Sequence, residues 1–120
     1  MFNYRASDPS ICQFYDVFPK DELKNGERAF IEIDHQSIVI FNIGGEFFAI
    51  ADICSHDDGP LGDGDLDGMR ITCPRHGAQF DLRSGKALTL PAVQDIPAYP
   101  VRVQNGMIQI GIPKDIQSSD

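Results

Sequence analysis

Basic residues are scarce in this sequence. Only 10 of its 120 residues are Lys or Arg, against 18 Asp or Glu, so the formal net charge is −8. Nucleic acids and anionic membrane surfaces are bound through Lys and Arg, and this balance therefore argues against both kinds of partner. An acidic carrier that docks on basic protein partners fits the charge better.

Cysteines are also few. There are three, and an odd number would leave one thiol over in a disulfide scaffold. Metal binding or thiol chemistry in a reducing compartment is therefore the better first hypothesis. Three buried structural cysteines are the alternative at this point.

Long apolar runs are missing as well. The most apolar stretch, residues 37–43, is far too short to span a bilayer. Residues 1–9 lack the basic start and apolar run of a targeting signal. We therefore expect a soluble, cytoplasmic protein. Eight prolines and 11 glycines are spread along the chain, which leaves no room for long helices.

Short strands are what the sequence does contain. Alternating or β-branched apolar runs occur at residues 28–34, 37–43, 46–51, 78–82, 101–104 and 107–110. Gly44-Gly45 and Asn105-Gly106 separate paired runs and are typical of hairpin turns, because these residues tolerate positive φ angles. Only residues 19–24 favour one or two turns of helix. With no repeat or linker, residues 1–120 are predicted to form one all-β domain, an antiparallel sandwich or small barrel.

Two short segments hold four residues of the types that bind metals. Cys54 and His56 form a C-x-H pattern, and after a gap of 16 residues Cys73 and His76 form C-x-x-H. Structural zinc sites usually pair like residues, as C-x₂₋₄-C and H-x₃₋₅-H, whereas here each segment contains one of each kind. The spacing favours a dinuclear iron–sulfur centre in which each loop gives a cysteine to one iron and a histidine to the other. A zinc site of two cysteines and two histidines is the alternative.

Together with the residues that follow them, these segments resemble Rieske-type ferredoxins. The stretch that begins at Cys73 reads C-P-x-H-G-x-x-F-D, which is highly specific, and Leu90-Pro91-Ala92 follows it. The resemblance covers roughly residues 12–112. It implies an all-β fold in which a larger antiparallel part carries a cluster-binding subdomain made of two loops, about residues 53–62 and 73–78.

The resemblance also assigns ligands and a function. Cys54 and Cys73 would bind the inner iron of one [2Fe–2S] cluster as thiolates, and His56 and His76 would bind the outer iron as neutral imidazoles. The protein would then be an electron carrier, not itself an enzyme, that passes single electrons from a flavin-dependent reductase to a terminal oxygenase. The small subunit of an assimilatory nitrite reductase is one alternative, and a zinc-stabilised interaction module is an alternative of another class.

Four positions differ from the high-potential branch of this family. Members of that branch carry an extra cysteine in each loop, at the positions of Gly59 and Arg75, and the two cysteines form a disulfide. They also place serine and tyrosine hydroxyls, which bond to cluster sulfurs, at the positions of Ala78 and Phe80. Fewer hydrogen bonds to sulfur lower the reduction potential. We therefore predict a potential in the lower part of the family's range of roughly −150 to +300 mV.

An acidic segment borders the first predicted loop. Residues 46–67 contain seven acids and no base. Such a run is usually only a solvated face. Because this one borders the predicted cluster loops, a docking role is the hypothesis for Asp57, Asp58, Asp63, Asp65 and Asp67.

Three other features have simpler interpretations. Residues 63–68 imitate the start of an EF-hand loop, but Pro74 occupies the place of the closing glutamate, so a polar turn is expected instead of a calcium site. Cys12 is expected to be a small buried residue, and His35 to lie on the surface at a hairpin tip.

Overall fold

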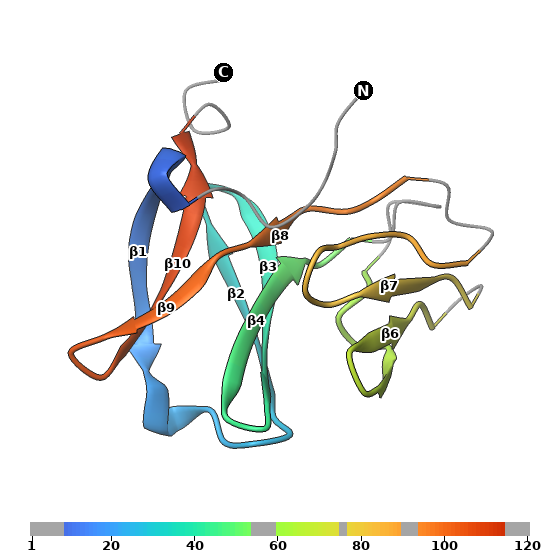
Figure 1. The fold of residues 1–120 in the computed structure, drawn as a ribbon, viewed down its shortest axis with the longest axis horizontal. Helices are drawn as coiled ribbons and strands as arrows, with labels where there is room; N and C mark the ends of the chain where they lie inside the picture. The colour runs from blue at the N-terminus through green and yellow to red at the C-terminus, as the bar shows by residue number, and fades with distance from the viewer. Residues whose placement is uncertain (1–8, 54–59, 75–76, 90–93, 115–120) are drawn as a thin grey trace.

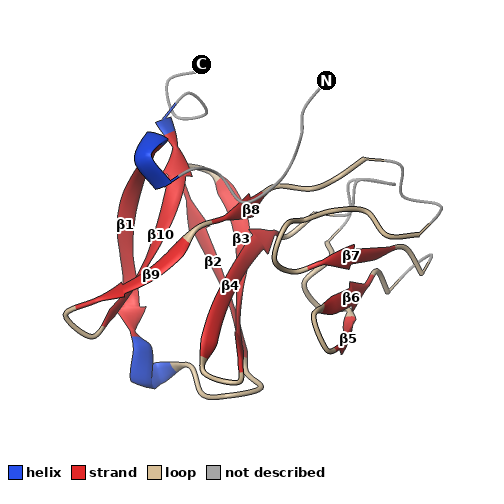
Figure 2. Ribbon diagram, viewed as in Figure 1, coloured by secondary structure: helices blue, strands red, loops and turns tan. Residues whose placement is uncertain are grey.

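The computed structural model describes residues 9–53, 60–74, 77–89 and 94–114 of the chain. Strands dominate these residues, and none of their helices is long and apolar enough to cross a membrane (Figures 1 and 2). The elements, in chain order, are η1 (Pro9–Ile11), β1 (Cys12–Pro19), η2 (Lys20–Glu22), β2 (Arg28–Ile33), β3 (Gln36–Ile43), β4 (Glu46–Ala51), β5 (Asp65–Asp67), β6 (Arg70–Thr72), β7 (Gln79–Asp81), β8 (Ala98–Tyr99), β9 (Val101–Gln104) and β10 (Met107–Pro113).

The strands form three antiparallel sheets, with the orders β1-β10-β9, β2-β3-β4-β8 and β5-β6-β7. Figure 1 shows the four-stranded sheet between the other two. Neighbouring sheets pack face to face, so the described strands make a layered sandwich and do not close into a barrel. The predicted all-β, antiparallel fold class is confirmed, in its sandwich form.

The central sheet separates two apolar cores. Successive side chains of a strand point to opposite faces, and β3 is buried on both of them. Ile38 and Ile40 enter a core that they share with isoleucines of β10. Val39 and Phe41 enter a second core, which includes Phe80 of β7. The second core joins the central sheet to the small sheet β5-β6-β7, which carries the predicted cluster loops.

The hairpin predictions are confirmed by the backbone. Asn105 and Gly106 have φ values of 54° and 77°, and Gly44 and Gly45 have values of 65° and 92°. The tip between β2 and β3 holds His35, which is exposed as predicted. Only three residues, in η2, form the short helix expected near Pro19.

Strands β5, β6 and β8 were not predicted. The supposed polar turn at residues 63–68 contributes strand β5, because Leu66 lies opposite Ile71 of β6 and both side chains pack into the second core. Strand β8 escaped prediction because it is only two residues long and is followed by Pro100. Among the described residues, no group of three or more His, Cys, Asp or Glu side chains is placed so that it could hold a metal ion.

Candidate metal centre

Cys73 directly follows β6, at the start of the second predicted loop. Its side chain is 1% exposed and belongs to the second core, together with Ala78 and Phe80. A bare thiolate is unfavourable in such apolar surroundings, and coordination to a metal ion supplies the compensating positive charge. The burial of Cys73 therefore fits its prediction as a thiolate ligand.

Two backbone hydrogen bonds close the second loop around this cysteine. The N–H of Cys73 donates to the carbonyl of Ala78 at 2.7 Å, and the N–H of Gly77 donates to the carbonyl of Cys73 at 3.1 Å. Gly77 has a φ of 77°, a conformation that residues with side chains rarely adopt. The chain therefore turns back within five residues. The predicted ligand His76 falls outside the described residues, as does Arg75.

The first predicted loop leaves the central sheet after β4. Its predicted ligands, Cys54 and His56, lie outside the described residues, as do Asp57, Asp58 and Gly59. Its returning end is described, and there Leu61 is fully buried in the same core as Cys73. The two loops are thus attached to one apolar core, although residues 63–72 separate them in sequence.

The returning end of the first loop is held by two side chains that sequence reasoning overlooked. Asp52 accepts hydrogen bonds from the backbone N–H groups of Leu61 and Gly62, at 2.9 and 2.6 Å. Arg28 of β2 donates to the carbonyls of Gly62 and Gly64, at 2.5 and 2.8 Å. In the sequence Asp52 is one acid of an acidic run, and Arg28 lies on the polar side of an alternating strand. Neither pattern reveals a loop contact.

The same segment also contacts the second loop. A Cβ atom on Gly64 would lie 2.0 Å from the carbonyl oxygen of Thr72, the residue before Cys73. Only glycine permits this approach, since real Cβ atoms essentially never come so close to another heavy atom. Gly64 is thus in backbone contact with the residue that precedes Cys73.

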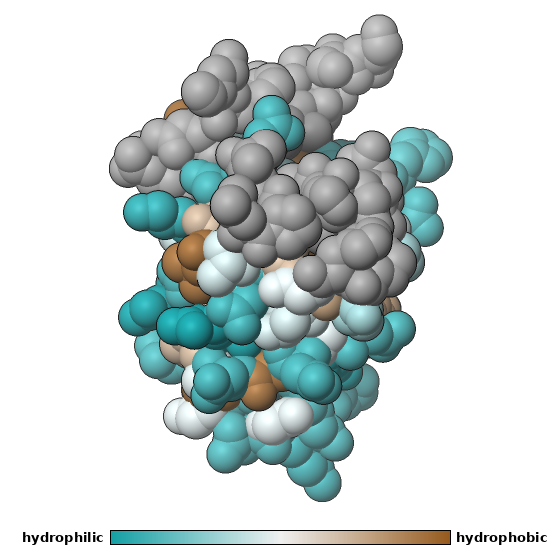
Figure 3. Space-filling model, turned by 90° about the vertical axis from the view of Figure 1, so that its right-hand side faces the viewer, coloured by the Kyte–Doolittle hydropathy of each residue, from teal (hydrophilic) through white to brown (hydrophobic). Residues whose placement is uncertain are grey.

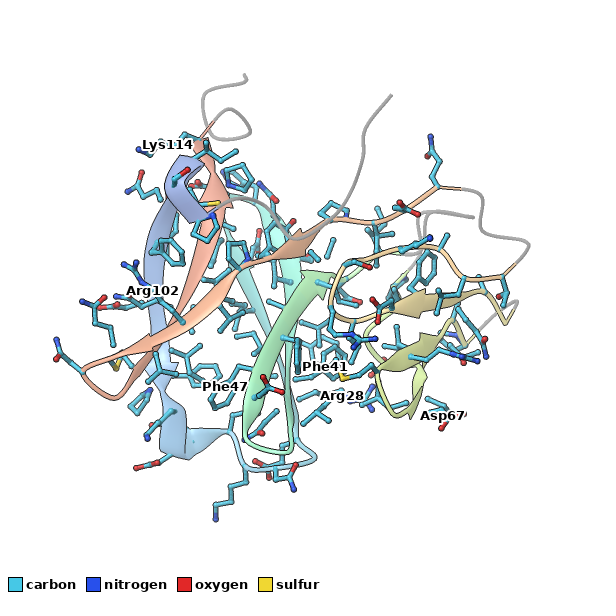
Figure 4. All side chains as sticks on the ribbon, in the orientation of Figure 1. Arg28, Phe41, Phe47, Asp67, Arg102 and Lys114 are labelled. Atoms are coloured by element: carbon cyan, nitrogen blue, oxygen red, sulfur yellow. The ribbon has the colours of Figure 1, made fainter. Side chains whose placement is uncertain are left out.

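Acidic side chains surround this part of the molecule. Asp63, Asp65 and Asp67 are all exposed, and Asp63 and Asp65 line a pocket of about 330 Å³ that also reaches Cys73. Asp67 lies opposite Arg70 in the β5-β6 pairing, and Figure 4 shows it at the outer edge of the small sheet. Figure 3, which looks at this side of the molecule, shows many hydrophilic residues below the grey atoms. The exposed bases Arg70 and Arg83 line a second pocket together with Asp67, so the small sheet carries charges of both signs.

The remaining predicted positions are placed clearly. Ala78 and Phe80 are fully buried, and Phe47 and Phe48 pack against the two cores. Cys12 is 8% exposed and begins β1, in a different sheet from the one that precedes Cys73, so its prediction as a small buried residue is confirmed.

Comparison with known proteins gives consistent results. Residues 13–100 match the family described as the Rieske [2Fe-2S] domain. The chain is 42% identical over 98 residues to the 3-phenylpropionate/cinnamic acid dioxygenase ferredoxin subunits of Escherichia coli strain K12 and Shigella flexneri, covering 80% of this chain and 91% of each relative.

Solved structures agree with this match. The ferredoxin of carbazole 1,9a-dioxygenase from Nocardioides aromaticivorans IC177 has a TM-score of 0.75 at 30% identity, over 81% of this chain and 95% of that chain. The Sphingomonas yanoikuyae B1 ferredoxin also has a TM-score of 0.75 at 30% identity, over 84% of this chain and 100% of that chain.

Proposed function

The chain belongs to the Rieske [2Fe-2S] domain family, and from this premise we propose that it passes electrons from a flavin-dependent reductase to the terminal oxygenase of a dioxygenase system. It carries one [2Fe–2S] cluster, which gives it the chemistry of a one-electron carrier. Like its relatives it is an electron-transfer component, and the oxygenase performs the catalysis.

The ligand assignment is part of this proposal. Cys54 and Cys73 bind one iron, and His56 and His76 bind the other. The spacing of these residues supports the assignment, and so does the burial of Cys73 at the start of a closed loop. Replacing two thiolates by neutral imidazoles removes two negative charges from the ligand set, so an electron is accepted more readily than by an all-cysteine cluster.

The choice of partners is supported by the named relatives. Those at 42% identity are ferredoxin subunits of a dioxygenase, and a ferredoxin subunit implies both an electron donor and an oxygenase acceptor. Neither a nitrite reductase subunit nor a zinc module gains support from these relatives. We further propose that residues 1–120 form a single Rieske domain, with cluster loops at about 53–62 and 73–78. We propose the cytoplasm as its location, because thiolate ligands persist in a reducing compartment.

Metal and sulfide analysis with electron paramagnetic resonance tests the cluster and its ligands. The purified protein should contain two irons and two acid-labile sulfides per chain. After reduction with dithionite it should give a lower average g value than an all-cysteine cluster. His76→Ser should abolish that spectrum, whereas His35→Ser, at an exposed hairpin tip, should leave it unchanged. A normal spectrum in His76→Ser would refute the ligand assignment.

Stopped-flow mixing tests the partners. Reduced protein is mixed anaerobically with the oxidised terminal oxygenase of the same host, and reoxidation of the cluster is followed by its visible absorbance. Rapid reoxidation, together with reduction of the protein by NADH only when the flavin reductase is present, is the expected result. Reoxidation no faster than in a mixture without oxygenase would contradict the proposed acceptor.

A further inference from the structure

We propose that Arg28 and Asp52 are positioning residues, which clamp the base of the first cluster loop and so hold the ligand Cys54 in place. Neither residue is a predicted ligand. The inference rests on the ligand assignment proposed above, because it concerns the loop that contains Cys54. It adds a requirement that the motif does not contain, namely that a strand of the larger part must hold the loop from outside.

Arg28 forms one half of this clamp. Its Nη1 atom donates to the carbonyl oxygens of Gly62 and Gly64, at 2.5 and 2.8 Å, across 34 and 36 residues of sequence. The guanidinium carbon lies 5.1 Å from the centre of the Phe41 ring, and Figure 4 shows the two residues side by side near the centre of the molecule. The cation–π contact fixes the plane of the guanidinium while its nitrogen reaches the loop.

Asp52 forms the other half. One carboxylate oxygen, Oδ1, accepts from the N–H groups of both Leu61 and Gly62. Gly62 is therefore held at both ends, by Asp52 at its amide and by Arg28 at its carbonyl. Hydrogen bonds to charged groups are the stronger kind, and these are partly buried.

The position of the clamp explains what it does. Asp52 precedes Cys54 by two residues, and Leu61 and Gly62 stand at the other end of the loop, so these bonds join the two ends of the segment that contains Cys54. Closing a loop costs conformational entropy, and a fixed closure reduces the number of positions open to residues within it. Space is also restricted, because a Cβ atom on Gly62 would lie 2.5 Å from the ring of Phe30.

The described hydrogen bonds of Arg28 all go to this loop. Among the residues that the structure describes, no carboxylate lies within ion-pair distance of it, and its described hydrogen bonds go to loop carbonyls. Gly64, one of its partners, packs against the carbonyl of Thr72 beside Cys73. Loss of Arg28 would therefore loosen the first loop and would also disturb the neighbour of a ligand in the second.

Chelator-driven loss of the cluster tests this role. Arg28→Gln, Arg28→Lys and Asp52→Ala are compared with the control Arg102→Gln. Arg102 is a well-matched control, because it also lies over a phenylalanine ring, Phe14 at 3.8 Å, and also donates a hydrogen bond, but from β9 in another sheet. Each holo protein is incubated with an excess of an iron chelator at 20 °C, and the decay of its visible absorbance is timed.

Arg28→Gln and Asp52→Ala should lose the cluster roughly tenfold faster than the wild type, because local opening becomes easier when a charged hydrogen bond is removed. Arg28→Lys should lose the cluster at a rate between those of Arg28→Gln and the wild type. A lysine ammonium keeps the positive charge but lacks the forked donor geometry of a guanidinium. Arg102→Gln should stay within about twofold of the wild type. Equal rates for Arg28→Gln and Arg102→Gln would overturn the proposal.

Two further readouts separate positioning from general stability and from the ligand assignment. Native-state hydrogen exchange of the wild type should show protected amides at Leu61 and Gly62, and rapid exchange there would refute the clamp even if the variants fail to fold. Iron and sulfide contents before chelator addition should be near the wild-type value in Arg28→Lys. Absence of a Rieske spectrum in the wild type itself would instead refute the proposed function.

Discussion

Gly85 and Ile96 are in direct backbone contact with each other. The N–H of Ile96 donates to the carbonyl of Gly85 at 2.8 Å, and a Cβ atom on Gly85 would lie 1.9 Å from the carbonyl oxygen of Ile96. Gly85 also has a φ of 75°. Gly85→Ala should therefore combine backbone strain with a clash that no side-chain movement relieves. We expect a melting temperature lower by about 10 °C, measured by circular dichroism.

Gly106→Ala is the control for this prediction. Gly106 has a nearly identical φ of 77°, but no heavy atom lies within 4 Å of its hypothetical Cβ. This variant should lower the melting temperature by only about 4 °C, the cost of the left-handed conformation alone. Equal losses in the two variants would show that the contact with Ile96 relaxes freely.

Ala78 provides a test of how the potential is set. Its side chain is fully buried in the core that contains Cys73, and the family resemblance places a hydroxyl at this position in high-potential members. A hydrogen bond to a cluster sulfur stabilises the added electron, so Ala78→Ser should raise the midpoint potential by about 40 mV, equivalent to about 1 kcal/mol. Redox titration monitored by visible absorbance measures the change.

A buried alanine of the other core makes the matching control. Ala49 is 1% exposed and packs in the core beside β10, away from the cluster loops. Ala49→Ser should lower the free energy of unfolding about as much as Ala78→Ser does, because both place a hydroxyl in an apolar core. It should leave the midpoint potential within about 10 mV of the wild type, because only a hydrogen bond to a cluster sulfur is expected to shift the potential. A shift of the same size in both variants would argue against hydrogen bonding as the cause.

Most of the fold could be predicted because its strong signals are local. The alternation of residues 28–34 and the Asn105-Gly106 turn depend on neighbours in sequence, and the structure has both. Strand β5 depends on a partner instead. Asp65 and Asp67 are residue types that strands rarely contain, so the sequence does not indicate a strand here. The segment is a strand because Leu66 pairs with Ile71 and packs on the second core.

The candidate site shows the same difference between local sequence signals and contacts of distant residues. Residue type and spacing predict Cys73 as a ligand, since the motif around it is contiguous, and the structure places Cys73 in a buried position at the start of a hydrogen-bonded loop. Arg28 and Asp52 could not be found in this way. Arg28 meets Gly62 only because β2 lies beside the returning end of the loop, and a contact across 34 residues leaves no periodic pattern in the sequence.

Cys12 should be dispensable for the cluster. It begins β1, whereas Cys73 follows β6 in a separate sheet, and the two side chains belong to different parts of the apolar interior. Cys12→Ala should keep the full iron and sulfide content and the same paramagnetic resonance spectrum, with a loss of stability of about 1 kcal/mol from the missing sulfur. Cys73→Ala should contain no cluster. A reduced iron content in Cys12→Ala would show that this cysteine contributes to the site.

The acidic side chains beside the cluster loops should govern encounter with the redox partner. Asp63, Asp65 and Asp67 are exposed, and opposite charges on two partners speed their association. The triple variant Asp63→Asn/Asp65→Asn/Asp67→Asn should slow electron transfer to the oxygenase about tenfold at low ionic strength. Its rate should also respond much less to added salt, because salt screens the attraction that the variant has removed.

The control for this prediction carries the same change of charge elsewhere. Asp21, Glu22 and Glu32 are also exposed but belong to η2 and β2, so Asp21→Asn/Glu22→Gln/Glu32→Gln alters the net charge by the same three units without changing a residue of the small sheet. This variant should keep most of the salt dependence, since a local patch directs the partner more strongly than total charge does. If both triple variants changed the salt dependence equally, total charge would explain the steering. If neither did, the acidic surface would have no part in docking.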